Sequence, residues 1–119
     1  MVIKISIIGT HQTGSTRVFN LIRLLYESQG KNVYSCWDYQ NDKDNKYDII
    51  VNKIHNCSIT DLKKYNIKIL PLRNILDSAV SANKRWPRIS LYESCHNNIL
   101  IFNKFNNFSD FIFVYEKYN

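Results

Sequence analysis

Residues 2–16, with the sequence VIKISIIGTHQTGST, decide the fold. Val2–Ile8 is rich in isoleucine, as expected of a strand that is buried on both faces. Gly9 and Gly14 bracket a polar loop, and Ser15–Ser28 then carries apolar residues at helical spacing. Backbone N–H groups of such a loop point inward, and the helix that follows adds its positive N-terminal end. This stretch therefore predicts a strand, a loop and a helix that together hold an oxyanion.

The rest of the chain alternates between strand and helix patterns. Further strands are predicted at Asn32–Cys36, Tyr47–Asn52, Asn66–Leu72 and Asp110–Tyr115. Helices are predicted at Ser58–Tyr65, Asn74–Lys84 and Ile89–Phe105, the last with an apolar side made of Leu91, Tyr92, Cys95, Ile99 and Phe102. Strands that alternate with helices pair with one another in parallel, and the helices form right-handed crossovers between them. We therefore expect one α/β domain over residues 1–119, with a three-layer fold like that of P-loop NTPases and a mainly parallel central sheet of about five strands.

The loop differs from the P-loop of nucleotide-hydrolysing enzymes. That loop requires a lysine directly after its second glycine, and Ser15 stands there instead. Nucleotide-hydrolysing enzymes also have an aspartate at the end of a strand, which helps to hold Mg²⁺. None of the predicted strands ends in such an aspartate, and Asp48 lies at the start of its strand. On its own, the loop is equally consistent with phosphate binding and with an ordinary glycine-containing turn between a strand and a helix.

Four segments, taken in order, resemble the sulfotransferase family. Gln12–Thr16 (QTGST) is similar to the family's phosphosulfate loop, which has Lys or Arg, Ser or Thr, Gly, and then two Ser or Thr residues. Val51–His55 (VNKIH) resembles its K-T-H motif at the end of a strand. Leu72–Ser81 (LRNILDSAVS) has the Arg-to-Ser spacing of the family's 3′-phosphate segment, and Val114–Glu116 (VYE) resembles a Tyr-Glu pair that ends a later strand.

The resemblance implies transfer of a sulfuryl group from 3′-phosphoadenosine 5′-phosphosulfate (PAPS) to a hydroxyl or amine acceptor, without a metal. Lys53 would stabilise charge on the leaving oxygen, and His55 would take the proton of the acceptor. Arg73 and Ser81 would bind the 3′-phosphate. The residues that would surround the 5′-phosphosulfate are Gly9, Gln12, Thr13, Gly14, Ser15 and Thr16.

Two departures from the family pattern leave other functions open. Gln12 stands where the family has a catalytic Lys or Arg, and an amide donates a hydrogen bond but supplies no charge. The chain is also shorter than members of the family, which is consistent with a minimal enzyme, with a homo-oligomer that completes its site with a neighbour, or with a relative that only binds. The first alternative is therefore a catalytically weak phosphonucleotide-binding protein. A P-loop nucleotide kinase is less favoured because of Ser15.

Several of these residues also have a purely structural interpretation. His55 is consistent with a surface histidine at the end of a strand. Arg73 and Asp77 lie four residues apart and are consistent with a surface ion pair worth only about 0.3–0.5 kcal/mol. Ser81 is consistent with a hydroxyl that bonds back to its own helix.

Charge and composition indicate which kind of ligand and which cell compartment to expect. The net charge of +6 is spread along the chain without a nucleic-acid motif, which favours a small anionic ligand over nucleic acid. Cys36, Cys57 and Cys95 show no metal-like spacing, as expected of reduced thiols. No charged leader precedes the first strand, and no apolar run is long enough to cross a bilayer. We expect a cytoplasmic protein that acts without a membrane or a metal on a small-molecule or glycan acceptor.

Overall fold

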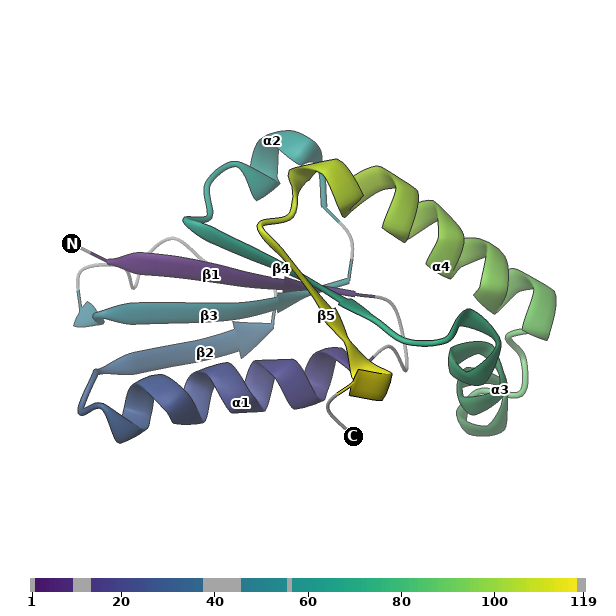
Figure 1. Ribbon diagram of the computed structural model, residues 1–119, viewed down its shortest axis with the longest axis horizontal. Coiled ribbons are helices and arrows are strands. Elements are labelled where there is room, and N and C mark those ends of the chain that lie inside the picture. Colours follow the sequence, from purple (N-terminus) through teal and green to yellow (C-terminus); the bar gives the residue numbers. More distant parts are fainter. Residues whose placement is uncertain (1, 10–13, 38–45, 56, 118–119) are drawn as a thin grey trace.

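The computed structural model describes residues 2–9, 14–37, 46–55 and 57–117. Its sheet has five parallel strands in the order β2-β3-β1-β4-β5 (Figure 1). The strands are β1 (Ile3–Ile8), β2 (Val33–Trp37), β3 (Ile49–Ile54), β4 (Ile67–Leu72) and β5 (Phe111–Val114). The helices are α1 (Ser15–Ser28), α2 (Ile59–Leu62), α3 (Ile75–Arg85) and α4 (Leu91–Phe105), with 3₁₀ turns η2 (Asn106–Phe108) and η3 (Tyr115–Lys117). The predicted α/β fold with a parallel central sheet is confirmed.

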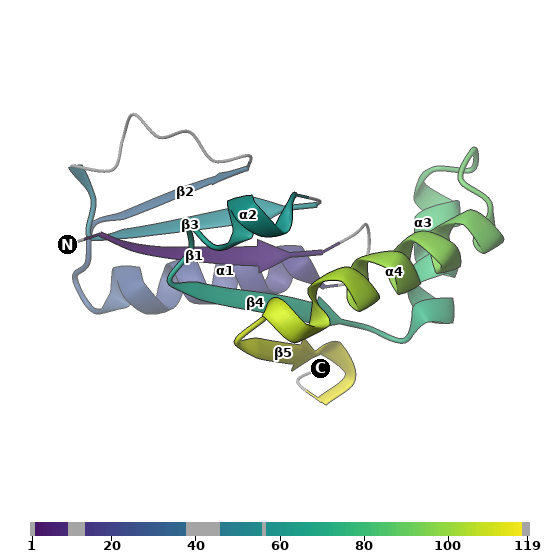
Figure 2. The ribbon, with the colours of Figure 1, turned by 90° about the horizontal axis from the view of Figure 1, so that it is seen from above.

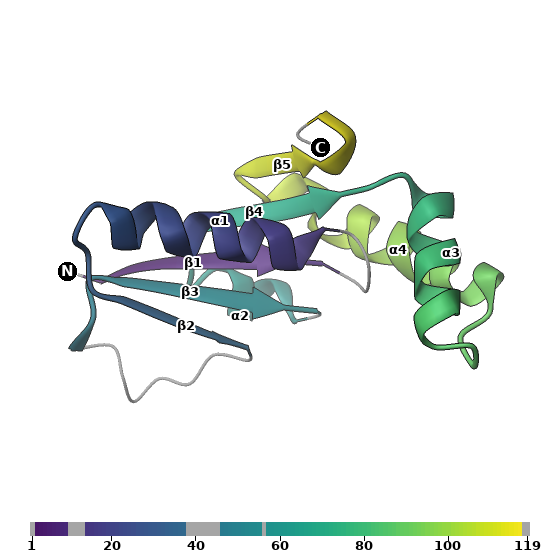
Figure 3. The same ribbon diagram turned by 90° about the horizontal axis from the view of Figure 1, so that it is seen from below.

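Helices cover both faces of the sheet and so create three layers. α2 and α4 lie over one face (Figure 2), and α1 lies over the other (Figure 3). Side chains of a strand point alternately to the two faces. Ile5 and Ile7 of β1 therefore pack with Phe19 of α1, whereas Ile8 packs with Phe105 of α4. The two clusters form the hydrophobic core on either side of the sheet.

β3 ends later than the sequence pattern predicted. The prediction was a strand at Tyr47–Asn52, but β3 continues to Ile54. Ile54 is in register with Ile8 of β1 and is buried, so pairing and burial extend the strand beyond its most apolar part. Lys53 consequently lies within a buried strand.

The apolar side predicted for the helix that became α4 is only partly correct, because Phe102 packs against the core but three of the other predicted residues are exposed. Tyr92 is 78% exposed, and Leu91 and Ile99 are each 44% exposed. The buried residues of α4 are Ser94, Asn98 and Phe105. Their spacing also matches one helical face, but two of these three residues are polar, so hydrophobicity did not indicate them. α4 therefore turns a carboxamide, that of Asn98, toward the interior.

Side-chain caps set the starts of three helices. Ser58 and Ser90 accept backbone N–H bonds at 3.1 and 3.0 Å, so α2 and α4 begin at the residues that follow them. The Ser58 cap agrees with the sequence prediction, although α2 is a single turn rather than a helix to Tyr65. Asn74 caps α3 in the same way, through the N–H groups of Leu76 and Asp77 at 3.1 Å.

Parallel pairing brings the ends of all five strands to one edge of the sheet, which we call the carboxyl edge. From β1 the chain moves to one side for β2 and β3, and then crosses to the other side for β4. The end of β1 is therefore a topological switch point, where open α/β sheets bind ligands. α3 lies beyond this edge and packs against α4 (Figure 1).

Candidate functional site

The end of β1 leads to the N-terminus of α1 at Gly14. Gly14 has a left-handed backbone, with φ of 84°, and its carbonyl oxygen accepts the N–H of Val18 at 3.2 Å. A β-carbon at Gly14 would lie 2.6 Å from Cδ2 of Tyr115, so both the backbone and the space require glycine. The first turn of α1 contains no acidic residue. The positive end of α1 is thus well suited to an anion at the carboxyl edge.

Lys53 brings a buried cation to this helix end. The residue is only 5% exposed, and Nζ donates a hydrogen bond to Oγ1 of Thr16 at 2.5 Å. Nζ also lies 4.0 Å from the centre of the Trp37 ring. Burial lowers the pKa of Lys53, and the positive charge of Arg85 lowers it further. An anion placed beside Lys53 and the first turn of α1 would offset both effects.

His55 lies beside the same tryptophan. The His55 and Trp37 rings are 5.8 Å apart between centres and tilted by 39°. Trp37 is the last residue of β2, in register with Lys53, and is 58% exposed. Trp37 is not among the residues that the sequence motifs singled out, although a large aromatic residue at the end of a strand is a usable signal. Lys53 and His55 are therefore brought together on one side of β3.

Tyr115 joins two arginines on the other side of β1. The guanidinium carbon of Arg73 lies 4.9 Å from the centre of the Tyr115 ring, and that of Arg17 lies 5.7 Å from it. The ring also fills the space next to Gly14. Arg73, from the end of β4, and Arg17, from the first turn of α1, thus lie beside the same ring.

Glu116 ties the end of the chain to the start of α3. Its Oε1 accepts the backbone N–H of Asn74 at 2.5 Å. This hydrogen bond is the main cause of the lowered pKa of Glu116, and the nearby charge of Arg73 contributes to the shift. The Tyr-Glu pair seen in the sequence therefore has a clear structural role, because Glu116 binds the backbone of Asn74 and Tyr115 contacts the Arg73 side chain.

Most of the residues that the sequence singled out and the structure describes lie at the carboxyl edge. Gly9 follows β1, and its N–H donates to the carbonyl of Ile54 at 3.0 Å. Arg73 lies directly before Asn74, the N-cap of α3, and so stands between β4 and that helix. Ser81 lies farther along α3 and is half-buried. Gln12 and Thr13 lie outside the described residues.

The part of the chain that the structure describes contains neither a metal-binding cluster nor a membrane-spanning helix. No group of three or more His, Cys, Asp or Glu side chains is arranged to hold a metal ion there. In those same residues, none of the helices has the length and apolar character needed to span a bilayer.

The chain matches no protein-family model, and a search of curated proteins finds no significant match. The resemblance to sulfotransferases consequently rests on the four sequence motifs.

Replacing Lys53 with Met is expected to remove a pH dependence of stability. Because the pKa of Lys53 is lowered in the folded state, the unfolded chain holds the proton more tightly. The free energy of unfolding should therefore rise as the pH increases from the lowered pKa toward the ordinary lysine value of 10.5. Urea denaturation across this range should show a flatter profile for Lys53→Met. Lys64→Met, which removes an exposed partner of Asp61, should keep the rise. Equal slopes in the parent and Lys53→Met would contradict the burial of this charge.

Proposed function

We propose that this protein transfers a sulfuryl group from PAPS to an acceptor. The observation that carries the proposal is the contact of Lys53 with Thr16, beside His55, at the N-terminus of α1. A buried cation and a nearby acid–base group at an anion-binding helix end are what transfer of an anionic group needs.

The distribution of cations supports a donor with two anionic groups. Lys53 lies on the β3 side of β1, and the pair Arg17 and Arg73 lies on the β4 side. The N-terminus of α1 lies between them. In this arrangement the 5′-phosphosulfate contacts Lys53 and the first turn of α1, and the 3′-phosphate contacts Arg73. Ser81, at the family's spacing from Arg73, supplies a second donor to the 3′-phosphate.

The chemistry follows from these positions. The acceptor oxygen or nitrogen attacks sulfur, and the bond between sulfur and the bridging oxygen of PAPS breaks. Adenosine 3′,5′-bisphosphate leaves with that bond's electron pair, and the acceptor's proton passes to His55. The Lys53 ammonium stabilises the charge that grows on the leaving oxygen. A bound dianion raises the pKa of Lys53, so the donor itself helps to keep this residue protonated.

A catalytically weak nucleotide-binding protein is the second candidate. Gln12 favours it, because the amide supplies no charge where the sulfotransferase family has a cation. A P-loop nucleotide kinase is less favoured, since Ser15 replaces the lysine that such a loop requires. The proposed sulfotransferase and the weak nucleotide-binding protein would use the same bisphosphate site. They differ only in whether sulfate is transferred at a useful rate.

Arg73→Ala is expected to weaken binding of adenosine 3′,5′-bisphosphate far more than binding of 5′-AMP. Loss of a charge-assisted contact of about 1.5–3 kcal/mol corresponds to a rise in Kd of roughly 10–100-fold. Isothermal titration calorimetry measures both ligands.

Arg23→Ala is the matched control for this prediction, because it also removes one guanidinium. Arg23 pairs with Glu27 within α1, away from the carboxyl edge. The control should leave the preference for the bisphosphate intact. A parent protein that binds 5′-AMP as tightly as the bisphosphate would rule out the assignment of Arg73.

A further inference from the structure

Asn98 is a buried carboxamide whose hydrogen-bonding groups are unused. The residue is 8% exposed, and neither Nδ2 nor Oδ1 has a hydrogen-bond partner among the described residues. The side chain carries two N–H donors and a carbonyl acceptor, and burying such groups without partners is costly. Nothing in the site described above makes use of it.

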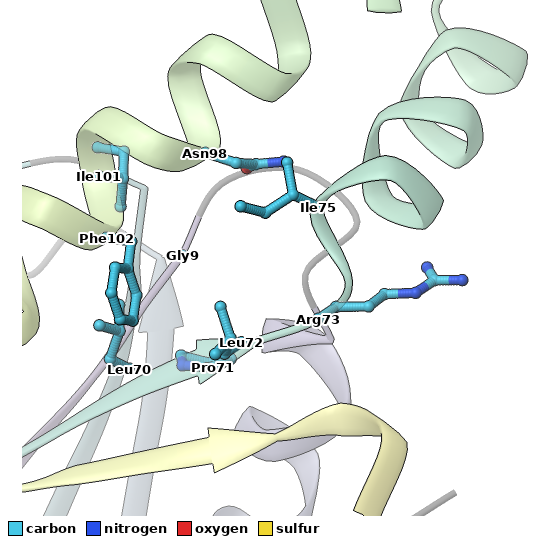
Figure 4. Close-up of a pocket in the computed structure, with 9 residues that line it drawn as sticks. All are labelled: Gly9, Leu70, Pro71, Leu72, Arg73, Ile75, Asn98, Ile101 and Phe102. Atoms are coloured by element: carbon cyan, nitrogen blue, oxygen red, sulfur yellow. The ribbon is translucent and has the colours of Figure 1, made fainter.

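Asn98 lines a small cavity at the carboxyl edge, beside Gly9. The cavity measures about 20 Å³, enough for one water-sized group but not for a ring. Figure 4 shows Asn98 reaching from α4 toward Ile75, while the Arg73 side chain points away from the cavity. Arg73 is also a lining residue, and the lining side chains besides Asn98 and Arg73 are apolar: Leu70, Pro71, Leu72, Ile75, Ile101 and Phe102.

The walls and the size of the cavity select the group that fits. A charged group is disfavoured because the Arg73 side chain points away and the side chains that face the cavity, apart from Asn98, are apolar. An amine acceptor, protonated near neutral pH, is therefore a poor occupant. A hydroxyl both donates and accepts through a single oxygen atom, so it matches the carboxamide of Asn98 within a water-sized space.

We propose that this cavity binds a hydroxyl group of the acceptor, which makes Asn98 a specificity-determining residue. The inference rests on the proposed sulfuryl transfer and names its acceptor class as polyhydroxyl molecules such as sugars.

The bound hydroxyl is distinct from the reacting one. Lys53 contacts Thr16 on the α1 side of the sheet, and His55 lies beside the same Trp37 ring. Asn98 comes from α4, which covers the opposite face. One hydroxyl therefore reacts near His55 while another is held by Asn98.

The first test compares D-glucose with its monodeoxy analogues as acceptors of labelled sulfate from PAPS. Loss of one particular hydroxyl should raise KM on the order of 10²-fold or more, because a site built to bond a hydroxyl strongly rejects a ligand without it. Asn98→Leu should abolish this discrimination. Asn97→Leu, at the exposed neighbouring position on α4, should preserve it. Equal discrimination in the parent and Asn98→Leu would overturn the inference while leaving sulfuryl transfer intact.

A second readout uses the parent protein alone and does not depend on turnover. With adenosine 3′,5′-bisphosphate bound, D-glucose should shift the side-chain ¹⁵N–¹H signals of Asn98, and one monodeoxy analogue should fail to do so. If these signals respond but no sulfate is transferred, the hydroxyl site stands and the proposed enzymatic function fails. If D-glucose leaves the signals unchanged, the hydroxyl site is wrong.

Discussion

His55→Ala is expected to lower the rate of sulfuryl transfer by roughly 10²–10⁴-fold, the range usual for loss of an acid–base catalyst. The affinity for adenosine 3′,5′-bisphosphate should stay nearly constant, because the side chain acts on the acceptor's proton. In the proposed mechanism the neutral imidazole of His55 is the base. Steady-state assays with labelled PAPS measure both effects.

His96→Ala supplies the matched control for His55. His96 lies on α4 with its ring stacked on Tyr92, 5.9 Å between centres, and takes no part in the proposed site. Its removal should leave the rate unchanged. If His55→Ala keeps full activity, another group takes the proton and the proposed mechanism is wrong.

Gly14→Ala is expected to destabilise the fold and to weaken nucleotide binding together. A left-handed backbone costs a residue with a β-carbon about 1–2 kcal/mol, and the clash with Tyr115 adds the cost of overpacking, typically ~1–3 kcal/mol. Relief of that clash must move either the Tyr115 ring, and with it Arg73, or the start of α1. Urea denaturation and calorimetry with adenosine 3′,5′-bisphosphate report the two losses.

Gly30→Ala separates backbone strain from the clash. Gly30 has a similar φ of 76°, but nothing lies within 4 Å of a β-carbon there. The Gly30→Ala variant should therefore lose only the stability that a left-handed backbone costs, and it should keep its affinity for the nucleotide. Tyr115→Ala should recover part of the loss in the Gly14→Ala background, as expected of residues in direct contact. Equal destabilisation by Gly14→Ala and Gly30→Ala would contradict the close packing of Tyr115 on the loop.

The fold could be predicted largely from local patterns. An isoleucine-rich strand, two glycines and an amphipathic helix identify the first unit, and alternation of strands with helices then implies a parallel sheet. Strand ends were less accurate because pairing decides them. Ile54 joins β3 through its register with Ile8, which no single segment of sequence reveals.

Residues of the candidate site could be predicted only where they belong to a sequence motif. Gly14, Lys53 and Arg73 stand in recognisable patterns, and the structure finds them at one edge. Trp37 and Asn98 belong to no motif, and their importance depends on which residues the fold brings next to them. For Asn98, a polar residue, the hydrophobic pattern gave no sign of burial, and the cavity that it lines is built by three separate segments.

Transfer of labelled sulfate from PAPS tests the central claim most directly. The parent protein, incubated with labelled PAPS and a panel of sugars, alcohols, phenols and amines, should yield a labelled product together with adenosine 3′,5′-bisphosphate. A chelator should not change the rate, and His55→Ala should remove most of the product. Absence of labelled product from every acceptor, in a protein that still binds the bisphosphate tightly, would contradict the enzymatic claim and leave a nucleotide-binding protein in its place.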